Sequence, residues 1–323
     1  MKFSPAQLRK AERTVIVSTC LFIVALAVVS FWVGWDDVQE PLSRVSLPLL
    51  LGLLGLSLIN YILRGARWAV FAKQLDVQLP LSRMALYYSA GFALVTTPGK
   101  IGTALRLWLM HQSHKVPYVR STPMLFMDNF TDLLAMLILA LLGASTVTGH
   151  GAMLGILVFF VGGLALFFAF PARWTHLLRY LNSKMGSPQP KLFEAGLNLL
   201  SHLQKLFSPS VLSGTALLST VGWGAECYAF YWLLAELGHP LSLMSATFIF
   251  AFATLVGALS MLPGGLGSAE AVMLALLTAL DIPMPTALAA TAIIRFTTLW
   301  FAVIIGFVVL PVALKKAKST STT

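Results

Sequence analysis

The sequence predicts an all-α polytopic membrane protein, with six spanning helices and two re-entrant helical hairpins arranged in two inverted-topology repeats. Of the 323 residues, 58% are hydrophobic and 11% are charged, whereas a soluble domain carries about 25% charged residues. Apolar runs of the length that crosses a bilayer, about 20 residues, recur along the chain. The motif Pro-Gly-x-x-Gly occurs twice, at 98–102 and 263–267, beside apolar runs that are too short to span. Paired interruptions of this kind point to the binding site of a transporter.

Each Pro-Gly-x-x-Gly motif is interpreted as the tip of a re-entrant hairpin, because proline and glycine break a helix. Broken backbone at membrane depth is tolerated only where it is buried in protein or lines a wet cavity. The residues expected to form the two turns are Pro98, Gly99, Gly102, Pro263, Gly264, Gly265 and Gly267. The alternative is that both hairpins cross the membrane completely. This would leave the other segments on the same sides, so the depth of the hairpins in the membrane stays open.

Composition also limits what else the chain contains. The longest polar connection, about 173–209, leaves no room for a sizeable soluble domain, so nucleic-acid binding is not expected. The formal net charge of +10 is expected to set orientation in the membrane. Cys20 and Cys227 fall inside apolar segments and are interpreted as packing residues. The first apolar run follows a basic flank but lacks an Ala-x-Ala-like site, which predicts an uncleaved first helix.

The whole chain, 1–323, is predicted to be one membrane domain. Its parts are an N-terminal helix (1–45), a first inverted unit (46–148), a connecting helix with a basic loop (149–208), a second inverted unit (209–314) and a basic tail (315–323). The six spanning helices are expected at 14–35, 46–71, 122–147, 152–170, 211–237 and 285–310. The helices of the first hairpin are expected at 84–93 and 101–110, and the second hairpin at 241–280.

Basic residues predict the orientation. Every basic cluster falls on one side of this arrangement, and loops rich in Lys and Arg are cytoplasmic. Both termini are therefore predicted to be cytoplasmic, in the cytoplasmic (inner) membrane of a bacterium. The loop after the first helix holds Asp36, Asp37 and Glu40 and is predicted to lie outside. Each unit consists of a spanning helix, a hairpin and a second spanning helix. The first unit then starts outside and the second starts inside, so the two units have inverted topology.

Two charged residues, Glu226 and Arg295, lie near the middle of predicted spans. A charge at that depth costs about 2.5–3.5 kcal/mol on insertion scales, so it needs a partner or water. One account pairs these two side chains with each other. Such a pair either fixes two helices structurally or forms a site for a charged head group or a coupling proton.

A second group of charges lies toward the cytoplasmic end of the third predicted span. Asp128 and Asp132 are four residues apart, so they share one helix face. Their expected partners are Lys100, Arg106, Arg64 and Arg67. The alternative is that these basic side chains only extend to the membrane interface. Glu270 follows the second glycine-rich break, where the helix dipole favours an acid, and capping alone would explain it.

The motifs lead us to expect no cofactor, no metal site and no enzyme activity. The six histidines fall in or near loops and lack a convincing metal-ligand context. The sequence contains no Walker A, nucleophile-elbow or zinc motif. The tryptophans mostly lie near predicted span ends, which is typical of an interfacial belt.

Several motifs resemble one known family. The stretch 262–270, Leu-Pro-Gly-Gly-Leu-Gly-Ser-Ala-Glu, followed by Arg295 in the next span, looks like the membrane region of lysylphosphatidylglycerol synthases, also called the flippase-like family. The stretch 98–106 resembles the Pro-Gly-x-x-Gly-Glu-x-x-Arg motif of that family, and 128–132 resembles its Glu-Arg-x-x-Asp. Arg64, Arg67 and Trp68 also fit, and the resemblance covers about 45–312.

The sequence departs from the family pattern at two positions. Thr103 stands where the family usually has glutamate, and Asn129 where it usually has arginine, so the head-group or ion preference is expected to differ. In fused members this region is thought to flip an aminoacylated lipid made by a C-terminal soluble synthase domain. No such domain follows Thr323, so the resemblance implies a stand-alone lipid translocator.

The predicted function is movement of an anionic or zwitterionic lipid between leaflets, flippase- or scramblase-like, through a polar cavity between the repeats. The residues predicted to bind the head group are Lys100, Arg106, Asp128, Asp132, Glu226, Glu270, Arg295 and Arg67. One alternative is a flippase for a polyprenyl-phosphate-linked sugar that serves a glycosyltransferase. Another is a non-transporting scaffold subunit of a lipid- or glycan-modifying enzyme. Membrane lipids are the expected partners, whereas the lipid, the direction, the energy source and the oligomeric state stay open.

Overall fold

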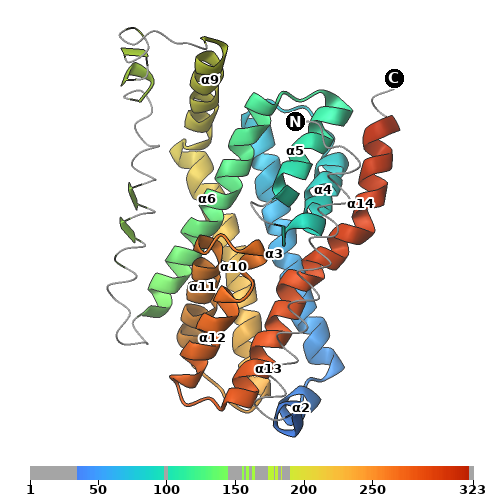
Figure 1. Ribbon diagram of the computed structural model, residues 1–323, viewed down its shortest axis with the longest axis vertical. Helices are drawn as coiled ribbons and strands as arrows, with labels where there is room; N and C mark the ends of the chain where they lie inside the picture. The colour runs from blue at the N-terminus through green and yellow to red at the C-terminus, as the bar shows by residue number, and fades with distance from the viewer. Residues whose placement is uncertain are drawn as a thin grey trace.

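The computed structural model describes residues 35–97, 101–144 and 190–319, together with scattered positions between 155 and 183. Every element in the three continuous ranges is helical, and the helices form an elongated bundle (Figure 1). Within these described residues, three helices are long and apolar enough to cross a bilayer: Leu47–Gln74, Tyr118–Gly143 and Met284–Ser319. The chain is a multi-pass membrane protein. The first predicted span, most of the fourth, and Pro98, Gly99 and Lys100 lie outside the described residues.

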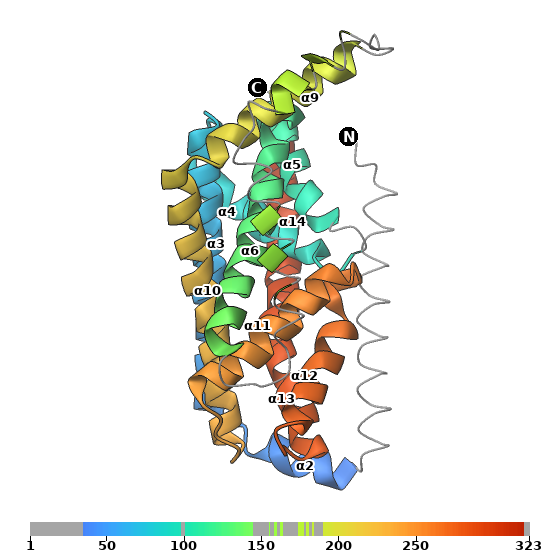
Figure 2. The ribbon, with the colours of Figure 1, turned by 90° about the vertical axis from the view of Figure 1, so that its left-hand side faces the viewer.

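Two helices of 28 residues each, α3 (Leu47–Gln74) and α10 (Pro209–Glu236), pack against each other along the bundle (Figure 2). At 1.5 Å per residue each is about 42 Å long, which exceeds the roughly 30 Å of hydrocarbon in a bilayer. The side chain of Ser46 starts α3 by accepting a hydrogen bond from the backbone N–H of Leu49 at 3.3 Å. These helices match the predicted second and fifth spans closely.

Four shorter helices form the two predicted hairpins. With 10 to 17 residues, each is shorter than the roughly 20 residues that a spanning helix needs. The first hairpin lies in the half of the bundle that contains the end of α14 (Phe301–Ser319), and the second lies in the opposite half (Figure 1). The helices of the first hairpin are α4 (Leu81–Ala90) and α5 (Ile101–His114), and those of the second are α11 (Leu243–Leu259) and α12 (Ser268–Thr278).

The tips of the two hairpins touch each other. The turn η1 (Gly91–Leu94) continues α4, and the turn η4 (Pro263–Gly265) lies between α11 and α12. A Cβ atom added to Gly264 would lie 3.1 Å from Cγ2 of Thr96, just beyond η1. The second Pro-Gly-x-x-Gly motif forms a turn as predicted, with φ values of +63°, +67° and +86° at Gly264, Gly265 and Gly267, a region that glycine adopts without steric cost.

Gly102 does not lie in a break. The sequence predicts it as a turn residue, but it occupies the first turn of α5, which begins at Ile101. The two copies of the motif are therefore not structurally equivalent at their last glycine.

The last predicted span is longer than expected. α13 (Met284–Arg295), the π-helical turn η5 (Phe296–Trp300) and α14 (Phe301–Ser319) form one continuous helix, which was predicted to end near 310. The lysines of the predicted tail therefore belong to its last turns. π-Helical turns often occur at functional sites, and this one directly follows Arg295. Gly306 allows α14 to approach the first hairpin, since a Cβ there would lie 2.7 Å from the Cα of Ala93.

Two helices occupy segments that the sequence predicts as polar connections. α2 (Trp35–Ser43) replaces the expected outer loop and packs on α13, with Val38 buried. α9 (Pro190–Leu206) lies in the expected basic loop and packs on α6 (Tyr118–Gly143), with Leu206 buried. Both are amphipathic helices whose polar face hides them from a search for apolar runs.

Charge is distributed unequally between the two ends of the bundle. The C-terminal ends of α3, α5 and α14 and the start of α6 gather at one end (Figure 1). Basic residues at that end include Lys73, Lys115, Arg120, Lys315, Lys316 and Lys318, against the acidic Asp76. The opposite end holds α2, the end of α10 and the turn between α12 and α13 (Figure 1). Acidic residues there are Asp37, Glu40, Glu236 and Asp281, against the basic Arg44.

Candidate functional site

Two facing stripes of polar side chains run along the contact between α3 and α10, and we call them together the polar seam. Within each stripe the residues recur at spacings of three and four, which places them on one helix face. Six of the eight are buried in the contact, and Arg64 and Trp223 are half-buried. The α3 stripe consists of Ser57, Asn60, Arg64 and Arg67, and the α10 stripe of Thr215, Ser219, Trp223 and Glu226.

The seam joins a buried arginine–aspartate cluster, which consists of Arg64, Arg67, Arg106, Asp128 and Asp132. Arg67 lies at its centre, where Nη1 donates to Oδ1 of Asp132 at 2.6 Å and Nη2 donates to Asp128. Arg64 Nη2 donates to the second oxygen of Asp132 at 2.7 Å. Arg106 Nη1 donates to Oδ2 of Asp128 at 3.1 Å. The structure thus confirms Arg64, Arg67 and Arg106 as partners of the two aspartates. The fourth predicted partner, Lys100, lies outside the described residues.

Arg106 is fixed by aromatic and backbone groups of the first hairpin. Its Nε donates to the carbonyl oxygen of Tyr88 at 3.0 Å, and its guanidinium carbon lies 3.8 Å from the centre of the Tyr88 ring. The rings of Trp68 and Phe92 lie at 5.6 and 5.3 Å. Arginine over aromatic faces is favoured by the ring quadrupole, the more so when both groups are desolvated. A Cβ on Gly91 would lie 2.7 Å from Cγ of Arg106, so glycine is needed there for the arginine to fit.

The cluster holds three guanidinium groups against two carboxylates, which leaves an excess of one positive charge. Its inner part is closed, since the Arg67 side chain is 0% exposed and those of Arg106 and Asp128 are 3% exposed. Arg64 and Asp132 are 18% and 16% exposed and form what we call the open edge, together with Trp223. The indole N–H of Trp223 donates to Asp132 at 3.0 Å, and Arg64 lies 5.1 Å from the centre of the Trp223 ring. The open edge is therefore the part of the cluster that is accessible from outside the protein.

Glu226 continues the seam beyond the cluster. Its Oε1 accepts a hydrogen bond from Nδ2 of Asn60 at 2.6 Å, and both side chains are buried. The account that pairs Glu226 with Arg295 is wrong, since the structure pairs Arg295 with Glu270. The physical reason is the broken helix: the glycine-rich turn brings Glu270 next to Arg295, whose Nε and Nη2 both donate to groups of that turn and its helix.

Glu270 and Arg295 stabilise the tip of the second hairpin. Arg295 Nε donates to Oε1 of Glu270 at 2.6 Å, and its Nη2 donates to the carbonyl oxygen of Gly264 at 2.8 Å. The other carboxylate oxygen of Glu270 accepts from the backbone N–H of Gly267 at 2.7 Å and so caps α12. Capping and an ion pair account for both residues, and their predicted role in head-group binding stays a prediction.

The two positions that depart from the family pattern lie beside the cluster in sequence. Asn129 Nδ2 donates to the carbonyl oxygen of Leu125 in its own helix at 2.9 Å. The side chain of Thr103 lies outside the described part of the chain. Among the described residues, no group of three or more His, Cys, Asp or Glu side chains is arranged to hold a metal ion.

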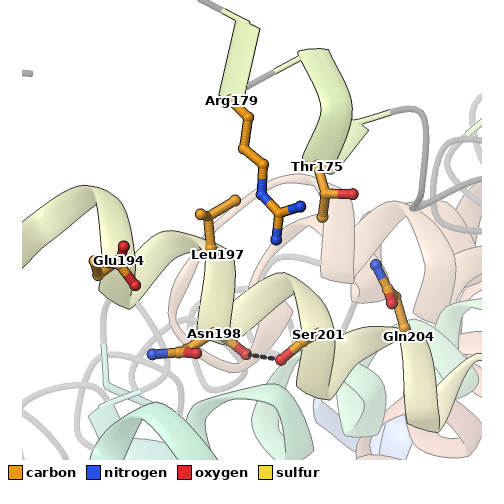
Figure 3. A pocket seen from close by; sticks show the side chains of 7 residues that line it. All are labelled: Thr175, Arg179, Glu194, Leu197, Asn198, Ser201 and Gln204. Carbon is orange, nitrogen blue, oxygen red and sulfur yellow. Dashed lines mark hydrogen bonds between the residues drawn. The ribbon is translucent and has the colours of Figure 1, made fainter. Parts of the chain in front are cut away.

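A surface cavity of about 370 Å³ lies beside α9 and apart from the seam. In Figure 3 the guanidinium group of Arg179 extends over the face of α9 that carries Leu197 and Ser201. The Ser201 hydroxyl donates to the backbone oxygen of Asn198 at 2.8 Å. The cavity shares no residue with the cluster or the seam, and no motif in the sequence pointed to it.

Comparison with known proteins identifies the family. The description "Lysylphosphatidylglycerol synthase TM region" matches residues 15–306. The chain is similar to a UPF0104 membrane protein of Pyrococcus horikoshii, with 20% identity over 318 residues that cover 90% of this chain and 94% of that protein. Two shorter similarities, 33% over 90 residues and 28% over 94 residues, are to UPF0104 membrane proteins of Methanothermobacter thermautotrophicus. The matched range covers most of the chain and includes the whole arginine–aspartate cluster. The chain therefore belongs to the family of the lysylphosphatidylglycerol synthase transmembrane region.

Proposed function

We propose that this protein moves an anionic or zwitterionic lipid between the two leaflets of its membrane. The lipid head group enters at the open edge of the arginine–aspartate cluster and moves along the polar seam, while the acyl chains stay in the bilayer. The phosphate contacts Arg64 first, and Asp132 or Glu226 receives an amine, a sugar hydroxyl or a proton. These residues bind, and the proposal gives none of them a catalytic role.

The excess positive charge of the cluster is the main observation that supports lipid binding. A purely structural ion-pair network inside a membrane would be expected to balance its charges, because an unpaired charge there costs about 2.5–3.5 kcal/mol or more. Here one guanidinium charge exceeds the carboxylates, and Arg64 stands where a ligand can reach it. A lipid phosphate supplies the missing negative charge and accepts hydrogen bonds from arginine in the geometry that its planar group favours.

In the proposed function, the chain has six spanning helices and two re-entrant hairpins in two inverted units. Each unit consists of a long helix, a hairpin and a second long helix, in the same order along the chain. The two hairpins lie in opposite halves of the bundle (Figure 1), and their tips meet at Gly264 and Thr96. Inverted units that meet at broken helices are typical of carriers that expose one site alternately to each side.

The unequal charge of the two ends supports an orientation for this architecture. The end that gathers the lysines and arginines is assigned to the cytoplasm, because basic segments beside spans remain on that side. Both termini are then cytoplasmic, and the membrane is the cytoplasmic membrane. A soluble lipid-modifying enzyme or a glycosyltransferase on this side is the expected functional partner, as the name of the fused family members suggests.

Translocation by the purified protein tests the proposal. Proteoliposomes that contain only this protein would carry fluorescent phosphatidylglycerol, phosphatidylethanolamine or a polyprenyl-phosphate lipid, and the fraction accessible to a reducing agent outside would be followed. We expect faster movement of at least one phospholipid than in protein-free vesicles. Acceleration of the polyprenyl lipid alone would favour the sugar-carrier alternative. No acceleration for any lipid, with or without an imposed proton gradient, would contradict the proposal and favour a scaffold.

A further inference from the structure

Glu226 is an acid enclosed on all sides by other helices. Its side chain is 2% exposed, and its only hydrogen-bond donor among the described residues is the neutral amide of Asn60. No ion pair to Glu226 forms within the described part of the chain. In contrast, Asp128 and Asp132 of the cluster and Glu270 at the tip of the second hairpin each have an arginine partner. The charged and titratable groups that act on it are Tyr61 and Arg64 of α3, Asp132 of α6, Arg295 of α13 and Cys227 of its own helix.

The hydrogen bonds of Asn60 indicate which form of the acid fits this place. Its Nδ2 donates to Oε1 of Glu226, while its Oδ1 is buried and accepts from no described group. A buried amide oxygen without a donor costs free energy. A carboxylic acid supplies the missing donor, because its O–H can donate to Oδ1 while its other oxygen accepts from Nδ2, and a carboxylate cannot do so. Acid and amide then form a cyclic pair with two hydrogen bonds.

We propose that Glu226 binds and releases the proton that accompanies each lipid, which deepens the proposed function and rests on it. In the neutral form Glu226 pairs with Asn60, and the arginine–aspartate cluster keeps its excess positive charge. In the ionised form the proton leaves Oε2 for water, and the carboxylate offsets the charge of Arg64 one turn away along the seam. An anionic head group therefore binds best when Glu226 is protonated.

This arrangement predicts symport of one proton with one anionic lipid. Binding linkage is reciprocal, so a phosphate at Arg64 strengthens proton binding at Glu226 by the same factor by which the proton strengthens phosphate binding. A negative head group and a proton move together without net charge, so translocation of an anionic lipid responds to a pH gradient and little to a membrane voltage. A zwitterionic lipid gains nothing from the proton at this site.

The proton site is tested first without any transport. Infrared difference spectra of the purified protein between acid and alkaline pH report the carbonyl band of a buried carboxylic acid. We expect a band that disappears in Glu226→Gln and persists in Glu236→Gln, an exposed acid on the same helix that accepts from Trp232. Glutamine has the shape of the neutral acid, so the variant is expected to fold, and an unchanged melting temperature verifies this. A band that is unchanged in Glu226→Gln overturns the proposal.

Transport then tests the coupling. In proteoliposomes an inward proton gradient should speed the inward movement of phosphatidylglycerol at least several-fold in the wild type and in Glu236→Gln. Glu226→Gln should move the lipid at a rate independent of pH. A gradient response that survives in Glu226→Gln overturns the coupling while the proposed function stands. If the wild type shows the Glu226 band but moves no lipid, the proton site stands and the proposed lipid translocation is contradicted.

Discussion

Arg67 is the residue on which the arginine–aspartate cluster depends. One guanidinium group donates to Asp128, Asp132 and Ser219, which come from two other helices. The side chain has no exposed surface, so water cannot replace any of these contacts. Burying a pair of ions gains little net free energy, but removing one partner leaves the other charged and unpaired in a medium of low dielectric constant.

Arg67→Met should therefore lower the free energy of unfolding in detergent by about 3–5 kcal/mol. The matched control is Arg44→Met, which removes an arginine from an exposed pair with Glu40, 47% and 61% exposed, at the other end of the bundle. A pair of that kind contributes about 0–1 kcal/mol. Equilibrium unfolding followed by circular dichroism measures both variants. Equal losses would show that the cluster does not hold α3, α6 and α10 together.

The contacts of single residues were predictable only in part. The spacing of Asp128 and Asp132 predicted that they share one helix face. Their location toward the cytoplasmic end, where the basic residues gather, indicated arginine partners. The partner of Arg295 could not be predicted by matching residues of equal depth in the membrane, as the pairing with Glu226 attempted. The turn at Gly264 brings Glu270 to Arg295 instead. Asn60 was missed because it is uncharged. The signal that pointed to it was its spacing of four residues from Arg64 and three from Ser57 in an apolar helix.

At the scale of elements, the second hairpin depends on how closely its helices approach. The tip carries three glycines with positive φ, a region that costs other residues about 1–2 kcal/mol. These positions differ in the space around them. A Cβ on Gly265 would lie 3.0 Å from the backbone of Gly257 in α11, whereas a Cβ on Gly267 would meet no atom within 4 Å.

Gly265→Ala and Gly267→Ala form a matched pair that separates these two effects. Both variants are expected to lose about 1–2 kcal/mol through backbone strain. Gly265→Ala should lose about 1–3 kcal/mol more, since α11 must move away from the tip to admit the methyl group. Thermal unfolding in the same detergent measures the difference. A tip that tolerated both changes equally would mean that the hairpin is loosely packed.

Element type followed from the sequence where apolar runs were long or broken by proline and glycine, as in α3, α10 and α11. The segments that became α2 and α9 were predicted as loops because half of each helix is polar. Burial of residues such as Val38 and Leu206 against α13 and α6 stabilises them, and this tertiary contribution is not visible in the sequence of the segment itself.

At the scale of the whole molecule, the inverted arrangement predicts which segments share a side of the membrane. The ends of the first hairpin, near Leu81 and Lys115, should face the cytoplasm, together with Lys316 at the end of α14. The ends of the second hairpin, near Leu243 and Asp281, should face the other side. The reason is that each hairpin enters and leaves through the same surface.

Single cysteines at these positions, in a background without Cys20 and Cys227, would test this topology. A membrane-impermeant maleimide applied to intact cells should label cysteines at 243 and 281 and leave those at 81, 115 and 316 unlabelled until the cells are opened. Labelling of 81 and 115 from opposite sides would show that the first hairpin counts as one crossing, and would remove the inverted relation between the two units.

In the proposed function, a lipid head group binds the excess positive charge at the open edge of the cluster. The most direct measurement is the rate of phosphatidylglycerol translocation in proteoliposomes by the wild type, Arg64→Gln and Arg44→Gln. We predict a loss of at least about tenfold in Arg64→Gln, which corresponds to roughly 1.4 kcal/mol of binding free energy, and a wild-type rate in Arg44→Gln. A folded Arg64→Gln protein that translocates this lipid at the wild-type rate would contradict the account.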